Sequence, residues 1–154
     1  MKKFFSILLT VALITALSAT AFAEDAQEIT VSYTASEAYV VTIPSSQALS
    51  AGSLSSTGTV SANVLLKAGD VLKVFMNSAN GFALKCGESA IAYSVEKDGA
   101  VLENDACVLE VAAGSTSGEK ELTFATTEQA VAAATIAGEH TDVITFSCSL
   151  IAAE

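Results

Sequence analysis

The residues best suited to chemistry in this chain are three cysteines and one histidine. The cysteines are Cys86, Cys107 and Cys148, and the histidine is His140. Each cysteine lies two positions from apolar residues, as on the apolar face of a half-buried strand. No two cysteines have the Cys-x-x-Cys spacing of zinc or redox sites. We therefore expect no metal site at the cysteines.

Two interpretations of the cysteines stay open. In the first, all three are buried thiols that pack as small apolar side chains. In the second, export to an oxidising place allows a disulfide, and the pair Cys86–Cys107 closes the hairpin between them. Cys148 is then the unpaired thiol. A catalytic cysteine is not expected under either interpretation.

Nucleophilic catalysis through an imidazole would have to use His140, because the chain has one histidine. This residue lies by a turn that enters the last predicted strand, and Asp142 would share its strand face, away from the core. A catalytic base needs a nucleophile and an orienting acid close by. We expect an exposed turn histidine and a protein that is not an enzyme.

Four acidic residues, Glu96, Asp98, Glu103 and Asp105, gather around one predicted hairpin. Carboxylates in such a group can bind Ca²⁺ weakly, but their spacing matches no calcium-binding loop. We expect a solvated acidic rim and no metal or cofactor.

The N-terminal residues predict export. Lys2 and Lys3 precede an apolar stretch at residues 4–17, which is shorter than the roughly 20 residues of a membrane span. Ala21-Phe22-Ala23 has the small-x-small pattern of a cleavage site, and Glu24 follows. We predict a signal peptide at residues 1–23 and one domain at residues 24–154, with no stable membrane insertion after cleavage. The alternative is a retained N-terminal anchor.

The charge of the chain is strongly negative. Its seven Lys and Arg residues oppose 17 Asp and Glu residues, and all seven cations are lysines. Loss of Lys2 and Lys3 with the signal peptide leaves five cations and a net charge of −12. Nucleic-acid binding needs a basic surface and usually arginine, and anionic membranes repel such a chain. We expect no nucleic-acid partner.

The elements that must position these residues are short strands, because apolar and polar residues alternate along most of the chain. The predicted strands are residues 29–34, 39–43, 60–66, 72–76, 82–86, 91–97, 100–103, 107–111, 120–125 and 144–150. Asp98-Gly99 between two such runs predicts a type I′ hairpin turn. Residues 46–58, rich in Ser, Gly and Thr, predict a long connection, in which an irregular edge strand is the alternative.

One stretch departs from the strand pattern. Residues 127–134 contain helix formers behind Thr127, which can act as an N-cap. The fold predicted is all-β: an antiparallel two-sheet sandwich of immunoglobulin-like, Greek-key type with one short helical crossover near 127–134.

Residues 137–150 carry a resemblance to known families. They read Ala-Gly-Glu-His-Thr-Asp followed by an alternating strand. This resembles the closing strand of spore-coat-U-type pilin domains of the chaperone–usher class and of WxL cell-wall-binding domains. The run Tyr39–Pro44 is a looser match to an early strand of similar secreted domains. Phe146 stands where a WxL domain has Trp, so the resemblance does not imply peptidoglycan binding of that type.

The resemblance implies a secreted bacterial immunoglobulin-like β-sandwich with a structural, interaction or adhesion role. Its expected location is extracellular or at the cell surface, or the periplasm of a two-membrane bacterium. The expected partner is a protein or the cell envelope. A second copy of this chain is included among these proteins, which would give self-association. The alternative is a polymerising pilin-like subunit, in which Ile29, Val31 and Tyr33 of segment 28–34 insert into another subunit as a donor strand. Under the ordinary interpretation, this segment is the first strand of its own domain. Residues 35–37 act as a hinge under either interpretation.

Overall fold

The alternating runs fold into antiparallel strands. The computed structural model describes residues 30–152, and these contain nine strands and one helix. The expected signal peptide, residues 1–23, lies outside the described residues. The elements in chain order are β1 (Ala38–Thr42), β2 (Ser55–Leu65), β3 (Val71–Ser78), β4 (Ala83–Cys86), β5 (Ser89–Lys97), β6 (Ala100–Val101), β7 (Ala106–Ala112), β8 (Ser117–Thr126), α1 (Glu128–Ala132) and β9 (Ile144–Ile151).

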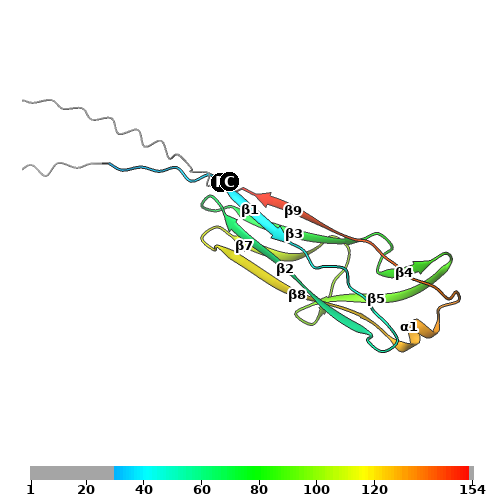
Figure 1. Cartoon of the computed structure of the whole chain (residues 1–154). Coiled ribbons are helices and arrows are strands. Elements are labelled where there is room, and N and C mark those ends of the chain that lie inside the picture. Colours follow the sequence, from blue (N-terminus) through cyan, green and yellow to red (C-terminus); the bar gives the residue numbers. More distant parts are fainter. Residues whose placement is uncertain (1–29, 153–154) are drawn as a thin grey trace, which may run out of the picture. The chain divides into compact units, whose positions relative to one another are not determined.

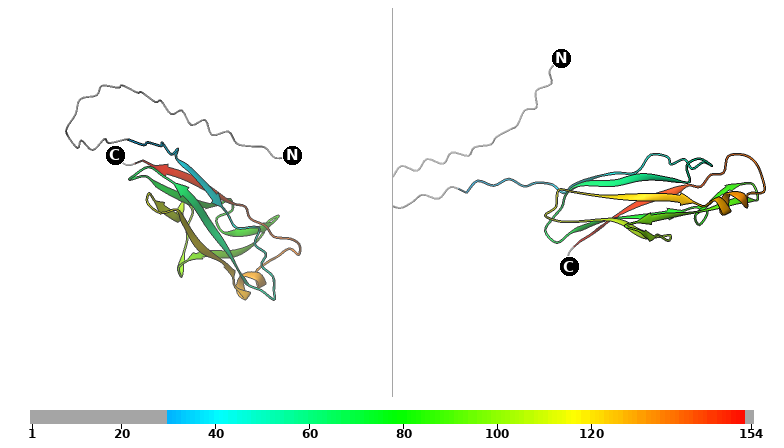
Figure 2. Two further views of the ribbon diagram at one scale, coloured as in Figure 1. Left: turned by 60° about the vertical axis from the view of Figure 1, so that its left-hand side comes forward. Right: turned by 90° about the horizontal axis from the view of Figure 1, so that it is seen from below.

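The strands form two packed sheets (Figure 1). The larger sheet has the order β1-β2-β8-β5-β4, and β6 pairs with β5. The smaller sheet has the order β7-β3-β9. Every pair of neighbouring strands is antiparallel. The predicted all-β antiparallel sandwich is therefore confirmed, and Figure 2 shows its two layers edge-on.

The core lies between the two sheets and follows the predicted period of two. Leu72, Val74 and Met76 alternate along β3, and each is fully buried. Val60, Ala62 and Val64 do the same along β2. Burial of each of these valine, leucine and methionine side chains stabilises the fold by about 1.5–3 kcal/mol relative to exposure. Alternation thus places one face of each strand in the core and leaves the other polar.

Two local predictions are confirmed. Asp98 and Gly99 connect β5 to β6 with φ angles of 53° and 80°, as a type I′ turn requires. Thr127 caps α1, because its side chain accepts a hydrogen bond from the backbone N–H of Ala130.

The predicted connection at residues 46–58 is wrong for its last four residues, because β2 begins at Ser55. Serine, threonine and glycine obscure the alternation there. Gly58 faces inward, and a Cβ at this position would lie 2.6 Å from Cβ of Pro44. Residues 43–54, which we call the strap, therefore lie against β2 where its side chains are small.

The structure contains three free thiols, so the expected Cys86–Cys107 disulfide is not formed in it. Cys107 is also out of its predicted phase. A β-bulge in the β3–β7 pair places Cys107 opposite Phe75 and buries both Val108 and Leu109. Cys86 and Cys107 are half-buried and Cys148 is exposed, so the interpretation as three buried thiols is wrong for Cys148.

Candidate functional site

The inner face of β9 is uncovered in its second half. Strand register places Phe146, Cys148 and Leu150 opposite the buried residues Met76, Val74 and Leu72 of β3. Residues directly opposite each other in a sheet share a face, so these β9 side chains point toward the core. Phe146 packs against the core, but Cys148 is exposed and Leu150 is 37% exposed. Within residues 30–152, no strand covers this end of β9.

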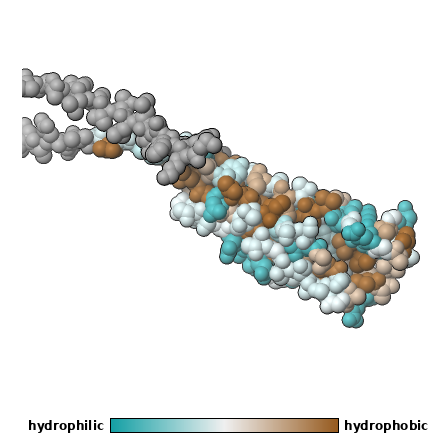
Figure 3. Space-filling view, in the orientation of Figure 1, coloured by the Kyte–Doolittle hydropathy of each residue, from teal (hydrophilic) through white to brown (hydrophobic). Residues whose placement is uncertain are grey.

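β1 borders the same side of the sandwich in the other sheet (Figures 1 and 2). Tyr39 and Val41 lie opposite the buried Val64 and Ala62 of β2, so both face inward. Tyr39 is nevertheless 44% exposed. We call the side bordered by β1 and β9 the seam. Apolar residues follow it on the face shown in Figure 3.

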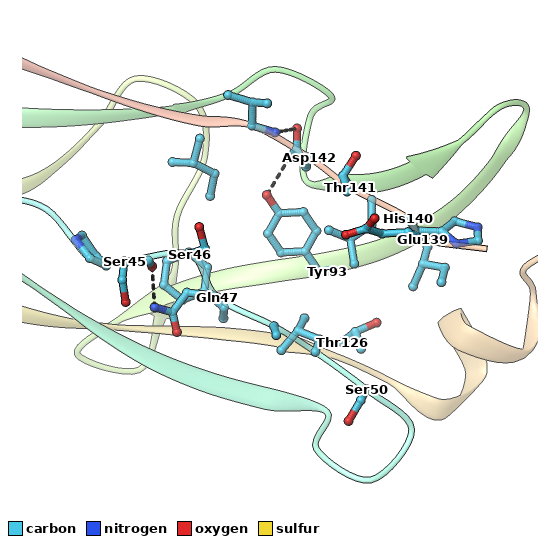
Figure 4. Close-up of a pocket in the computed structure, with 18 of the residues that line it drawn as sticks. Ser45, Ser46, Gln47, Ser50, Tyr93, Thr126, Glu139, His140, Thr141 and Asp142 are labelled. Carbon is cyan, nitrogen blue, oxygen red and sulfur yellow. Dashed lines mark hydrogen bonds between the residues drawn. The ribbon is translucent and has the colours of Figure 1, made fainter.

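A pocket of about 780 Å³ opens toward the end of the sandwich that carries α1 (Figure 4). Its floor is the inner face of the larger sheet, and its two walls are the strap and the residues that enter β9. Floor residues are Leu84, Ile91, Tyr93, Phe124 and Thr126, and wall residues include Ile43–Ala51 and Gly138–Ile144. The floor is mostly apolar and the walls carry polar groups, which suits an amphipathic chain segment.

Asp142 anchors the wall that leads into β9. Its carboxylate accepts hydrogen bonds from Ser78 Oγ and Tyr93 Oη, each at 2.6 Å. It also accepts from the backbone N–H groups of Asn80 at 3.0 Å and Val143 at 2.7 Å. The four bonds join the entry of β9 to the end of β3 and to β5, and Figure 4 shows the bond from Tyr93.

These bonds also shift two pKa values. Burial acts to raise the pKa of Asp142, but the four hydrogen bonds outweigh it and hold this pKa below its ordinary value of 3.8. Burial, together with the hydrogen bond to Asp142, raises the pKa of Tyr93. Asp142 is therefore ionised and Tyr93 protonated at neutral pH, as the bond between them requires.

His140 differs from its expected exposed position. It is half-buried, its Nε2 lies 2.9 Å from Ser89 Oγ, and its Nδ1 lies 3.1 Å from the Gly138 carbonyl oxygen. A serine beside a histidine resembles a catalytic pair. Here Ser89 is 1% exposed and already accepts a hydrogen bond from the Thr135 N–H. The pair fastens the crossover to β5 and presents no accessible nucleophile.

The acidic residues of the predicted rim do not act as one group, because two of them contact different side chains. Asp98 forms an ion pair with Lys120 at 3.0 Å, and Asp105 accepts a hydrogen bond from Asn77. Within residues 30–152, no group of three or more acidic, cysteine or histidine side chains is placed to hold a metal ion.

The segment that precedes β1 is not a strand of its own domain. Residues 30–34 form no strand, and Val31 and Tyr33 are each 92% exposed. For these residues the interpretation as an ordinary first strand is wrong. Ile29, the third apolar residue of the segment, lies outside the described residues.

Sequence reasoning missed the roles of Tyr93 and Ser78 in this site. An aspartate before a strand can bond local backbone groups, and Asp142 accepts such a bond from the Val143 N–H. The contacts to Ser78 and Tyr93 span 64 and 49 residues, and no local pattern encodes them. The seam was also missed, because alternation shows which face points inward but not whether another strand covers it.

Comparisons with known proteins give little further information. No protein-family model matches the chain, and no curated protein matches it. Among solved structures, the chain is similar to the P pilus rod subunit PapA, with 15% identity and a TM-score of 0.43. The match covers 64% of this chain and 80% of that chain. No helix within residues 30–152 has the length and hydropathy needed to cross a membrane.

Proposed function

We propose that this protein is a secreted or cell-surface structural protein that binds an extended segment of a protein partner along its seam. The observation that carries the proposal is the uncovered inner face of β9, where Cys148 and Leu150 face the core but remain exposed. A contiguous apolar patch on the surface of a protein often marks a site of contact with another protein.

A strand is the occupant that fits this site. β9 pairs with β3 on one side only, so its second edge offers backbone N–H and C=O groups to an incoming strand. Alternate side chains of that strand would cover Leu150 and Tyr39. A strand addition of this kind combines main-chain hydrogen bonds with side-chain pockets.

The second candidate function is polymerisation, in which the strand is segment 28–34 of another copy. Val31 and Tyr33 favour it, because both are apolar, in alternation and 92% exposed. Burial of each would contribute about 1.5–3 kcal/mol. Two or three such side chains, with the main-chain bonds, can offset an association cost of about 4–15 kcal/mol.

The test is the oligomeric state of the purified protein, measured by size exclusion with light scattering. Polymerisation predicts a concentration-dependent ladder that disappears in the double variant Val31→Asp/Tyr33→Asp. The matched control is Thr30→Asp/Ser32→Asp, which adds the same charge at the alternate positions and keeps the ladder. A wild-type chain that stays monomeric at high concentration contradicts polymerisation. Binding of a strand from a different protein is tested separately, by a pull-down with strand peptides.

The proposed function also includes export of the protein and a role that is not enzymatic. Residues 1–23 have the pattern of a signal peptide, and the hydroxyl beside the half-buried His140 belongs to Ser89, which is 1% exposed and therefore not an accessible nucleophile. N-terminal sequencing of the protein from the culture medium or the cell surface should begin at Glu24. A chain that retains Met1 and stays in the cytoplasm contradicts the proposal.

A further inference from the structure

We propose that the partner strand at the seam is β9 of a second copy of this chain, and that the two β9 strands pair antiparallel about a two-fold axis through Cys148. This inference rests on the proposed strand addition at β9 and names its occupant. The product is a closed dimer, because pairing about a two-fold axis uses the same edge of both copies. Exchange of segment 28–34 would instead extend into a polymer.

The backbone of β9 directs every second residue toward its free edge. The register of β3 with β9 continues to Ala79 and Val143, where the Ala79 N–H donates a hydrogen bond to the Val143 carbonyl oxygen at 2.9 Å. Bonded and non-bonded pairs alternate along an antiparallel ladder, so the odd-numbered residues of β9 bond to β3. The N–H and C=O groups of Phe146, Cys148 and Leu150 therefore point to the edge that no strand within residues 30–152 covers.

Two β9 strands can satisfy these groups mutually in registers that pair even-numbered residues with even-numbered residues. Axes through Ser147 and Cys148 pair the most residues of Ile144–Ile151, and the axis through Cys148 has an exposed inward-facing side chain at its centre. In that register, Phe146 of each copy lies opposite Leu150 of the other. Residues opposite each other share a face, so each phenylalanine ring would cover a Leu150 side chain that is now 37% exposed.

Charge favours this edge as the place where two copies meet. The chain has a net charge of −10 at pH 7, so two copies repel each other over most of their surface. β1, the strap and β9 lie within residues 38–66 and 143–152, and neither range contains a charged residue. Contact along the seam therefore brings together uncharged borders, without placing like charges opposite each other.

Other sheet edges carry the charges that β9 lacks. β7 contains Glu110, which forms an ion pair with Lys73 at 3.0 Å, and β4 contains Lys85. Charged side chains on an edge strand oppose its pairing with another chain. The uncharged edge of β9, with its inner side chains exposed, is therefore the edge open to a second copy.

The first test places charges on the outer face of β9, away from the core. Ser147 and Ser149 are exposed, and the proposed register sets Ser147 of one copy opposite Ser149 of the other. Ser147→Glu/Ser149→Glu puts like charges opposite each other and should weaken dimerisation at least about tenfold. Ser147→Lys/Ser149→Glu puts Lys opposite Glu at both places and should dimerise as the wild type does. Sedimentation equilibrium of the purified protein measures the dissociation constants.

A further variant controls for total charge. Gln129→Glu/Ala132→Glu adds the same two negative charges as Ser147→Glu/Ser149→Glu, at exposed positions of α1. It should dimerise as the wild type does, within about threefold. An equal loss of dimerisation in this variant would show that net charge, and not pairing of β9, controls association, and would overturn the inference.

The outcomes also separate this inference from the proposed function. Equal dissociation constants for the two variants at Ser147 overturn the register, and a wild type that stays monomeric at high concentration overturns the dimer. Neither result contradicts strand addition from a different protein, which fails if strand peptides do not bind to β9. A ladder in place of a dimer overturns the closed dimer and supports exchange of segment 28–34.

The second test uses Cys148 as a reporter of the axis, in the background Cys86→Ser/Cys107→Ser. Added oxidised glutathione should join the Cys148 thiols of two copies. Each disulfide formed releases two protons and two electrons, which convert one oxidised glutathione to two reduced molecules. Opposite residues of a hydrogen-bonded antiparallel pair have Cα atoms about 5.5 Å apart, which a disulfide can span.

The matched control moves the thiol along the same strand, with Thr145→Cys added and Cys148→Ser. Thr145 is also exposed, but its two copies would lie six residues apart along the paired strands, or about 20 Å. Non-reducing gels should show a cross-linked dimer that forms at least about tenfold faster through Cys148 than through the control cysteine. Equal rates overturn the inference.

Discussion

β7 and β9 are the two edges of the same three-stranded sheet, and they differ in what covers them. On β7, Val108, Leu109 and Val111 are at most 4% exposed, and the strand packs against β2 and β8 of the other sheet. On β9, Leu150 is 37% exposed although it also faces inward, opposite the buried Leu72 of β3. Both strands alternate and both pair with β3. The difference comes from the opposite sheet, which covers one edge and stops short of the other.

The largest expected effect compares one leucine on each edge. Leu109→Ala should lower the free energy of unfolding by about 3 kcal/mol, because it leaves a cavity in a packed core. Leu150→Ala should lower it by less than about 1 kcal/mol, because the same atoms are already partly hydrated. Urea denaturation measures both. Equal losses would show that β9 is covered in solution.

The next effect concerns the anchor of β9. Asp142→Ala removes the acceptor of four hydrogen bonds and leaves the hydroxyl proton of Ser78, which is 3% exposed, without its acceptor. We expect a loss of about 2–3 kcal/mol of unfolding free energy. The control is Glu139→Ala at an exposed neighbouring position, which should change stability by less than about 0.5 kcal/mol. A small loss in both variants would mean that the entry of β9 is held by other contacts.

These comparisons show what local sequence could predict. Alternation located the strands at residues 107–111 and 144–150, which contain Leu109 and Leu150, and Asp98-Gly99 and Thr127 identified a turn and a cap. Alternation could not distinguish the two leucines, because their burial depends on strands distant in the chain. It also misplaced Cys107, since the β-bulge shifts the phase by one residue within β7. The candidate site, in turn, depends on long-range bonds to Asp142 and on an edge that no strand within residues 30–152 covers.

A smaller effect tests how closely the covered edge is packed. A Cβ at Gly118 of β8 would lie 2.6 Å from Cγ2 of Val111 on β7. Gly118→Ala should therefore cost about 1–2 kcal/mol by forcing the sheets apart at this edge. Gly52→Ala, in the strap and with nothing within 4 Å of the added carbon, is the matched control and should be nearly neutral. Thermal unfolding followed by circular dichroism compares them.

The smallest expected effect is a dependence of stability on pH that arises at the open edge. Because the pKa of Asp142 is held below 3.8 in the folded state, its ionised form stabilises the fold above that value. This contribution disappears as the pH falls through the lowered pKa, since the folded state must then also take up the proton. Stability of the wild type should exceed that of Asp142→Asn at about pH 7, and the gap should narrow toward about pH 3. Glu139→Gln removes an exposed carboxylate three residues earlier and should not change this dependence. A gap that is constant across the range would mean that Asp142 contributes by shape and neutral hydrogen bonds. The entry of β9 would then be held, like β7, by contacts whose strength does not depend on charge.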